Sequence, residues 1–394
     1  MSSPYFSFFC PVKVIAGFKA LEHIPYELGT HGAKRPLLVT DRGVRGAGLV
    51  EIVTAALSSG SVTVPAIFDD VPPDSSTTVV AEAARLYRQN DCDSIVAVGG
   101  GSVIDTAKAV NILVSEGGDN LRAYCGASVL KRPLRPFFVL PTTSGTGSEV
   151  TSVCVVKDIE AGVKLPFVSQ YLLPNVAVLD PRLTLGLPPF FTAATAMDAL
   201  THAVEAFTGL AKNPISDAYA TAAIKKVAVN IVPVLTNPKD APRRLELALA
   251  ATMAGIAFSN SMVGLVHALG HSVGAIAHVP HGVCMSVLLP YVLEYNLDAR
   301  RDAIGELLLP LAGSDIYAAT RSSERAEKTL VHLRKLRDEL FALAGLPRTL
   351  SETGKVPREK LPDIARLALD DGALVTNPVE AQYEQALAVL ERAY

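Results

Sequence analysis

Short apolar segments alternate with helical patterns along the first half of the chain. Apolar runs that end in turn residues predict strands at residues 36–40, 61–68, 94–98, 136–140, 154–157 and 176–179. Between the early runs, residues 76–89 and 102–114 show the spacing of apolar positions that is typical of helices. This alternation predicts a parallel α/β sheet.

A proline break at residues 187–189 separates this pattern from a second half that is almost entirely helical in character. Long Ala- and Leu-rich periodic segments predict helices at residues 192–207, 215–235, 243–258 and 322–343. A length of 394 residues suits two domains of ordinary size. We therefore expect an α/β domain over residues 1–187 and an all-helical domain over residues 188–394.

Composition and charge narrow the function classes. The chain has 36 Lys and Arg against 39 Asp and Glu, scattered without a basic stripe, so we expect neither nucleic acid nor a membrane as a partner. The longest apolar run, residues 247–258, is shorter than the roughly 20 residues that span a bilayer. The five cysteines are widely spaced, and residues 1–17 lack the pattern of a secretion signal. These features favour a cytoplasmic protein with reduced thiols.

A glycine-rich turn, Gly99-Gly100-Gly101-Ser102, joins a predicted strand to a predicted helix. Glycines at such a turn let the backbone approach a ligand, and the helix N-terminus offers free N–H groups to a phosphate. The alternative is a tight turn in which Ser102 and Asp105 only form a capping box. The segment is neither the G-x-G-x-x-G fingerprint nor a P-loop, so an ordinary Rossmann assignment is unsupported.

A second polar loop, residues 141–149, concentrates hydroxyl groups and glycines after the strand at 136–140. Ligands bind at such strand ends in open α/β sheets, although a flexible surface turn would have the same composition. Asp41 follows the strand at 36–40 and is a candidate acceptor for ribose hydroxyl groups. Its charge would repel a 2′-phosphate and so favour NAD over NADP, whereas the alternative role is a helix N-cap.

Five of the eight histidines lie between residues 202 and 281. Asp198 and His202 are four residues apart on one predicted helix, His267 and His271 form a second such pair, and His281 follows in a loop. One carboxylate and three imidazoles suit a divalent transition metal, and we expect His281 rather than His271 to complete the set. The spacing leaves that choice open. Either pair alone would also be compatible with hydrogen-bonded core histidines.

These motifs together resemble the iron-containing, group III alcohol dehydrogenases over nearly the whole chain. The matching strings are GGGSxxD at 99–105, PTTxGTGSE at 141–149, DAxxHAxEA at 198–206, GxxHAxxH at 264–271 and PHG at 280–282. The resemblance implies a dehydroquinate synthase-like architecture, with an N-terminal α/β dinucleotide-binding domain and an all-α C-terminal metal-binding domain. It agrees with the boundary drawn above.

The resemblance also implies roles for individual residues. The implied metal ligands are Asp198, His202, His267 and His281, while His271 is the implied catalytic histidine between metal and nicotinamide. The implied cofactor contacts are Asp41, Gly99, Gly100, Gly101, Ser102, Asp105, Thr142, Thr143, Thr146, Thr151, Lys164, Leu183 and His271. Apolar positions are expected to line the substrate pocket and to favour a short alcohol or aldehyde, at Val153, Phe258 and Met262.

The implied activity is that of a metal-dependent NAD(H) alcohol dehydrogenase or aldehyde reductase. The family favours Fe²⁺, whereas Zn²⁺ generally binds such a ligand set more tightly. One alternative is a non-redox, NAD- and metal-dependent lyase of the dehydroquinate synthase type. Another is a maleylacetate reductase, which would favour a more cationic pocket. The resemblance further implies a homodimer or a higher homo-oligomer.

Overall fold

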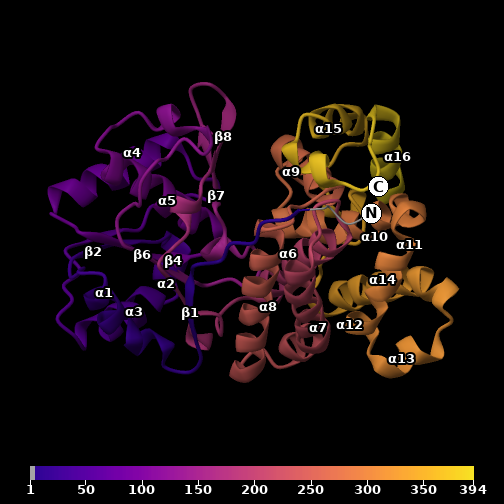
Figure 1. Ribbon diagram of the computed structural model, residues 1–394, viewed down its shortest axis with the longest axis horizontal. Coiled ribbons are helices and arrows are strands. Elements are labelled where there is room, and N and C mark those ends of the chain that lie inside the picture. Colours follow the sequence, from indigo (N-terminus) through magenta and orange to yellow (C-terminus); the bar gives the residue numbers. More distant parts are fainter. Residues whose placement is uncertain (1–4) are drawn as a thin grey trace. The chain divides into compact units, whose positions relative to one another are not determined.

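The computed structural model describes residues 5–394, and these divide into two compact units (Figure 1). One unit spans residues 10–187 and contains the strands. The other combines residues 5–9 with residues 188–394 and is helical. The predicted first domain begins at residue 1, and its residues 1–4 lie outside the described residues.

Residues 5–9 group with the helical unit through specific contacts. The ring of Phe8 stacks on that of Tyr219, with the ring centroids 5.9 Å apart. The backbone N–H of Phe9 donates to Asn260 Oδ1 at 2.7 Å. The α/β unit is therefore shorter at its start than the predicted domain.

The α/β unit is built on the parallel sheet that the alternating pattern predicts. Within residues 5–394, this sheet has six strands in the order β1-β9-β6-β4-β2-β3, and every neighbouring pair is parallel. The strands are β1 (Lys13–Ala16), β2 (Pro36–Val39), β3 (Ala66–Phe68), β4 (Ser94–Gly99), β6 (Phe137–Pro141) and β9 (Val176–Leu179). Five helices accompany them, namely α1 (Ile24–Thr30), α2 (Arg42–Gly46), α3 (Leu49–Ser58), α4 (Thr77–Gln89) and α5 (Gly101–Glu116).

Apolar cores cover both faces of the sheet. Along β2, Leu37 and Val39 face a core that contains side chains of α4 and α5, whereas Leu38 faces a core that contains side chains of α1 and α3. A strand that is buried on both faces needs apolar residues at successive positions, which explains the continuous runs in the sequence. Because β4 and β6 are parallel neighbours, the two polar loops that follow them lie at the same edge of the sheet.

One strand prediction needs correction, and one predicted strand lies outside the parallel sheet. The run at 61–68 forms a strand only from Ala66, because Pro65 has no N–H to donate to the ladder. The run at 154–157 is a strand, but it belongs to a separate sheet in the order β5-β8-β7, where β7 and β8 are antiparallel. Its strands are β5 (Gly126–Ala127), β7 (Val153–Asp158) and β8 (Val163–Val168).

The second half is helical, as predicted. Its helices are α6 (Pro189–Thr208), α7 (Pro214–Thr236), α8 (Ala241–Ser259), α9 (Leu265–Ala277), α10 (His281–Tyr295), α11 (Leu297–Glu306), α12 (Leu308–Ala312), α13 (Ser314–Ala319), α14 (Arg325–Ala344), α15 (Leu361–Ala368) and α16 (Tyr383–Ala393). The predicted helix at 322–343 starts with a single 3-10 turn, Ser322–Glu324, and is α-helical from Arg325. Helix α6 packs against α7, α8 and α10 and is buried along most of its length.

Helix α7 is long and apolar enough, by length and composition alone, to cross a membrane. It packs against both α6 and α8, and its apolar residues contribute to the core of the helical unit. A core helix of this kind accounts for its apolar composition.

Candidate active site

Helix α6 places two candidate metal ligands on one face. Asp198 and His202 are separated by one turn, and their exposed fractions are only 2% and 5%. The surrounding residues of α6 are mostly Ala, Leu, Met and Val. Polar groups this deeply buried require partners, because burying them without a hydrogen bond or an ion costs free energy.

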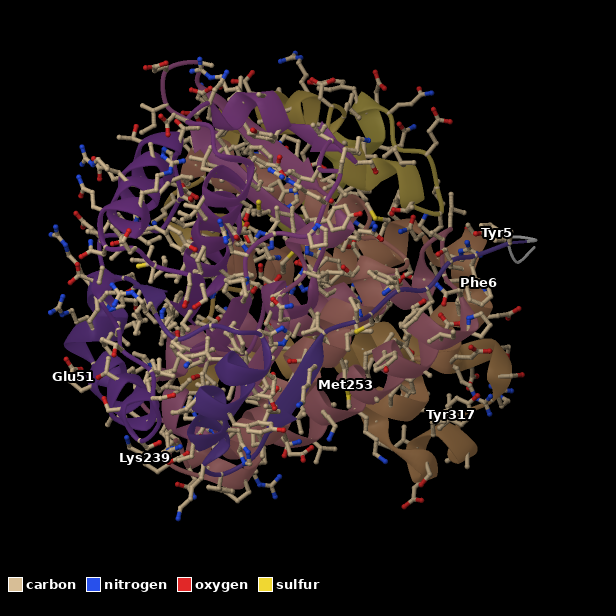
Figure 2. The ribbon with its side chains drawn as sticks, turned by 60° about the vertical axis from the view of Figure 1, so that its left-hand side comes forward. Tyr5, Phe6, Glu51, Lys239, Met253 and Tyr317 are labelled. Carbon is tan, nitrogen blue, oxygen red and sulfur yellow. The ribbon has the colours of Figure 1, made fainter. Side chains whose placement is uncertain are left out.

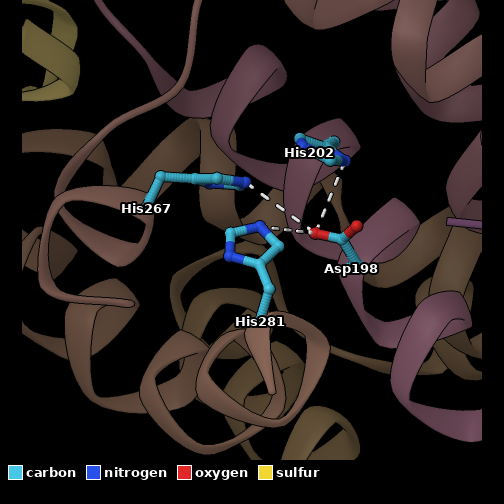
Figure 3. Close-up of side chains that lie close together, drawn as sticks. All are labelled: Asp198, His202, His267 and His281. Atoms are coloured by element: carbon cyan, nitrogen blue, oxygen red, sulfur yellow. Dashed lines mark ion pairs between the residues drawn. The ribbon is translucent and has the colours of Figure 1, made fainter. Parts of the chain in front are cut away.

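Two further histidines converge on Asp198 from other helices (Figure 3). The distances from Asp198 Oδ1 are 3.8 Å to His202 Nδ1, 3.9 Å to His267 Nε2 and 3.2 Å to His281 Nε2. The ligand atoms of these four side chains all lie within 4.8 Å of one another. Ligands held about 2.1 Å from a tetrahedral ion are roughly 3.4 Å apart, so the spacing fits a four-coordinate metal.

The unsatisfied atoms of the cluster provide a second test of its fit to a metal. Asp198 Oδ1, His202 Nδ1 and His267 Nε2 are buried and have no hydrogen-bond partner. A buried polar atom without a partner costs about 1–3 kcal/mol. A divalent cation would satisfy all three atoms at once.

A glycine brings His281 to this cluster. His281 is the first residue of α10, and a Cβ atom on the following Gly282 would lie 2.2 Å from the carbonyl oxygen of Ala194 on α6. Only glycine lets the two backbones approach so closely. The motif Pro280-His281-Gly282 therefore combines a ligand with the residue that allows its helix to dock.

Burial and charge favour the protonation states that bind metals. Burial opposes ionisation of Asp198, but the imidazoles around it hold the pKa of its carboxyl group below its usual range. Burial lowers the pKa of His202 to about 3 and the pKa of His267 well below its ordinary value. Near neutral pH, Asp198 is therefore a carboxylate and His202 and His267 are neutral imidazoles, as a transition metal requires.

Glu205 contacts the cluster, although the sequence motifs gave it no role. This buried residue lies on α6, its Oε1 accepts the backbone N–H of Val266 at 2.7 Å, and its Oε2 accepts Nδ1–H of His267 at 2.5 Å. Burial raises the pKa of Glu205 to about 7. Its hydrogen bond fixes the His267 ring so that Nε2 faces Asp198. The DAxxHAxEA string contained the signal, but spacing along one helix could not identify a partner on another.

His271 lies beside the cluster but is not part of it. Its side chain is 45% exposed, and its ring stacks on that of His281 with the centroids 5.4 Å apart. Its Nδ1 is hydrogen-bonded to Asp371 Oδ2 at 2.7 Å. Burial opposes ionisation of Asp371, but the hydrogen bond from His271 holds the pKa of this carboxyl group below its ordinary value.

The glycine turn of the α/β unit has no capping box, so that alternative was wrong. Gly100 is the N-cap of α5, and the Ser102 hydroxyl donates instead to the carbonyl oxygen of Pro73. The Asp105 carboxylate accepts from Ser148 Oγ at 2.9 Å and from the Val155 N–H at 3.0 Å. These partners lie in the second polar loop and in β7, so Asp105 ties the turn to both.

The two polar loops meet at the carboxyl ends of β4 and β6. The Thr142 N–H donates to the carbonyl oxygen of Gly99 at 3.1 Å. A Cβ atom on Gly101 would lie 2.9 Å from Thr146 Cγ2, and one on Gly100 would lie 3.3 Å from Thr143 Oγ1. The glycines are therefore needed for close packing against the threonine loop. Among residues 5–394, no side chain caps the N-terminus of α5, so its free N–H groups are suited to binding a phosphate.

Lys108, on α5, is hydrogen-bonded to the end of the 141–149 loop and to the residues that follow it. Its ammonium group is buried and donates to the carbonyl oxygens of Thr151 and Val153, both at 2.8 Å, and to Ser148 Oγ at 3.3 Å. Burial lowers the pKa of Lys108 and raises the pKa of Asp105, which lies three residues earlier on α5. This network is a structural support that the sequence motifs did not reveal.

The remaining predicted cofactor residues, Lys164, Leu183 and Asp41, lie in different parts of the α/β unit. Lys164 lines a pocket of the α/β unit together with Asp74, Ser75, Ser102, Asp105, Val155 and Lys157. Leu183 is buried shortly after β9. Asp41 is the N-cap of α2, since its Oδ1 accepts the Val44 N–H at 2.8 Å, and its contact with a ribose stays a prediction.

The three predicted substrate-pocket residues have different surroundings. The ring of Phe258 stacks on His202, with centroids 4.2 Å apart and an angle of 15° between the planes. Met262 is 48% exposed and has a positive φ of 64°. Val153 begins β7 in the α/β unit. Phe258 is thus an apolar cover on a candidate metal ligand, and the substrate contacts of all three stay predictions.

Comparisons with known proteins identify the family of this chain. Residues 11–181 match the family described as iron-containing alcohol dehydrogenase, and residues 192–394 match the C-terminal region of the Fe-containing alcohol dehydrogenase family. The NAD-dependent methanol dehydrogenase of Bacillus methanolicus is 34% identical over 387 residues, which are 98% of this chain and 99% of the relative. The 1,3-propanediol dehydrogenase of Klebsiella pneumoniae is 36% identical over 396 residues, with 100% of each chain covered.

A solved structure of a 1,3-propanediol oxidoreductase has a TM-score of 0.94 and 35% identity to this chain, covering 99% of this chain and 100% of the other. Fold and sequence thus define an oxidoreductase of the alcohol dehydrogenase class. The chain belongs to the iron-containing alcohol dehydrogenase family, which confirms the resemblance and the predicted fold class. The family match also confirms NAD(H) and a divalent metal as the cofactor class.

Proposed function

We propose that the protein interconverts a small primary alcohol and its aldehyde, with NAD(H) as the hydride carrier and a divalent metal at the Asp198 cluster. The observation that carries this proposal is the convergence of three buried, unpartnered ligand atoms in a member of the iron-containing alcohol dehydrogenase family. The proposed ligands are Asp198, His202, His267 and His281, with Fe²⁺ as the first candidate and Zn²⁺ as the second.

The residues around the cluster divide the chemical tasks. When bound, a divalent metal supplies positive charge that favours an ionised alcohol and polarises a carbonyl group. Phe258 covers His202 and keeps water from one side of the ligand set. His271 is partly exposed beside the cluster, so its Nε2 is suited to accept or deliver the hydroxyl proton.

The α/β unit is the proposed NAD(H) site, with the boundary at residues 187 and 188. The glycine turn at 99–102 and the threonine loop at 141–149 lie together, which supports pyrophosphate binding at the N-terminus of α5. Asp41 caps α2 and carries a negative charge, which would repel the 2′-phosphate of NADP if the ribose binds beside it. This supports a preference for NAD.

Short alcohols are the proposed substrate class. Phe258 presents an apolar ring at the cluster, and two relatives are named for methanol and 1,3-propanediol. The lyase and maleylacetate reductase alternatives make different products. NADH formation from a panel of primary alcohols tests the proposal, because a non-redox lyase would give no net NADH and a maleylacetate reductase would require a diacid.

A cytoplasmic homodimer or a larger homo-oligomer is the proposed form. Strand β1 is an edge strand of the parallel sheet, and its Val14 is 37% exposed, while nearby Phe18 is 60% exposed. In the helical unit, Tyr5 and Phe6 also lie at the surface (Figure 2). An edge strand with exposed apolar side chains is suited to association with a second copy. Light scattering of the purified protein tests this proposal, because a monomer would contradict it.

A further inference from the structure

Asp371 makes two separate hydrogen bonds with its two carboxylate oxygens. Its Oδ2 pairs with His271 Nδ1 at 2.7 Å, across 100 positions of the chain. Its Oδ1 accepts the Ala373 N–H at 2.9 Å and so caps a short 3-10 helix, η9 (Gly372–Thr376). The contact with His271 is therefore additional to an ordinary capping role.

The segment that carries Asp371, here termed the 371–377 strap, is anchored at its other end. Asn377 Oδ1 accepts the Leu265 N–H at 3.2 Å, at the start of the helix that carries His271. The side chains of Asn377 and Asn296 are buried and hydrogen-bond to each other at 3.0 and 3.1 Å. The strap is thus fixed to the N-terminus of α9 and reaches His271 further along this helix.

We propose that Asp371 is a positioning residue for His271 in the proposed reaction. Its carboxylate accepts Nδ1–H, which leaves Nε2 as the nitrogen that can accept the hydroxyl proton when NAD⁺ takes hydride from the alcohol, or deliver a proton to the oxygen when NADH reduces the aldehyde. The same hydrogen bond fixes the orientation of the ring. Carboxylate–histidine pairs hold the tautomer and orientation of the imidazole in this way in other enzymes. This inference rests on the proposed function of the site.

Two substitutions separate positioning from capping. Asp371→Asn keeps the shape and an oxygen for the Ala373 N–H, but it turns an NH₂ group toward His271 Nδ1 and favours the opposite tautomer. Asp371→Ser keeps the cap and removes the contact with His271. Asp370→Asn makes the same carboxylate-to-amide change at an exposed neighbouring residue and serves as the matched control.

The kinetic experiment measures kcat, KM, bound metal and NADH binding for these variants and for His271→Ala. Asp371→Asn should lower kcat roughly 10- to 100-fold, with unchanged metal content and NADH affinity, and Asp370→Asn should match wild type. In the His271→Ala background, Asp371→Asn should change kcat by less than about twofold, because its effect passes through His271. The proposal would be overturned if Asp371→Asn lowered kcat by the same roughly 10- to 100-fold in the His271→Ala background. It would also be overturned if Asp371→Asn alone had the kcat of wild type.

A second readout does not depend on turnover. Nitrogen-15 NMR of histidine-labelled, Zn²⁺-loaded protein reports which imidazole nitrogen carries hydrogen, and His271→Ala identifies the His271 signal. We expect a proton on Nδ1 in wild type and its loss from Nδ1 in Asp371→Asn. A wild-type Nδ1 without a proton would overturn the inference. Absence of alcohol turnover in wild type would instead contradict the proposed function and leave this spectroscopic test decisive for Asp371.

Discussion

The side chains of the cluster and the neighbouring His271 differ in whether they have hydrogen-bond partners in the protein. Asp198, His202 and His267 each keep a buried ligand atom without a partner, whereas His271 Nδ1 is bonded to Asp371. This difference separates residues that would hold a metal from one that would move a proton. The sequence favoured His281 as the fourth ligand, but spacing alone did not exclude His271, which is four residues from His267 on the same helix.

The contrast between His281 and His271 gives the first prediction. His281→Ala should release the metal and abolish turnover, because it removes one of four proposed ligands. His271→Ala should retain metal and bind NADH while turnover falls about 10²–10⁴-fold, the usual contribution of a general acid or base. Elemental analysis of both purified variants checks this. If His271→Ala lost the metal and His281→Ala retained it, His271 would be the ligand and the present assignment of the two histidines would be wrong.

Glu205 gives a second prediction. Glu205→Gln should weaken metal affinity about 10- to 100-fold, because the amide is a poorer acceptor for Nδ1–H of His267 than a carboxylate. Competition with a chelating dye measures the affinity. Glu246→Gln, at a partly exposed carboxylate on α8 that pairs with Lys226, is the control and should leave it unchanged. Equal affinity in the Glu205 variant would show that the hydrogen bond does not orient the ligand.

Asp41 gives a prediction about cofactor choice. Asp41→Asn removes the charge but keeps an N-cap side chain for α2, so the fold should be little affected. The ratio of kcat/KM for NAD to that for NADP should fall, because repulsion of the 2′-phosphate is lost. Steady-state kinetics with both cofactors measures this ratio. An unchanged ratio would mean that Asp41 serves only as a cap.

At the scale of secondary-structure elements, strands can be predicted from local sequence, whereas hydrogen bonds between elements cannot. The strands at 36–40 and 94–98 were predictable because they are buried on both faces and are therefore apolar except at Thr40 and Ser94. By contrast, the hydrogen bonds of Ser102 and Asp105 could not be predicted, because their partners Pro73, Ser148 and Val155 lie on other elements. Capping boxes are local patterns, but long-range hydrogen bonds depend on which elements the fold brings together.

The docking of α10 on α6 gives a prediction at this scale. Gly282→Ala would place a Cβ atom 2.2 Å from the Ala194 carbonyl oxygen, so the start of α10 must shift and carry His281 with it. We expect a loss of about 1–3 kcal/mol in unfolding free energy and weaker metal binding. Gly274→Ala is the control, because its nearest atom would be 3.6 Å away. Denaturant unfolding and metal titration compare the two, and equal behaviour would refute the packing argument.

For the whole molecule, the order of motifs along the chain was more informative than any single motif. The glycine turn alone was compatible with a capped turn, and either histidine pair alone with core packing. Together they identified the family, which the matches over 11–181 and 192–394 confirm. The hydrogen bond between Asp371 and His271 could not be predicted, because nothing in the local sequence around 371 indicates contact with a histidine 100 residues earlier.

Metal-dependent alcohol oxidation is the property that unites the cluster, the cofactor loops and the family. The most direct measurement is NADH formation from NAD⁺ and a short primary alcohol by protein stripped of metal and then titrated with Fe²⁺ or Zn²⁺. Activity should be absent without metal and rise until about one ion is bound per chain. Full turnover by metal-free protein, or no NADH from any primary alcohol after metal loading, would contradict the proposed function.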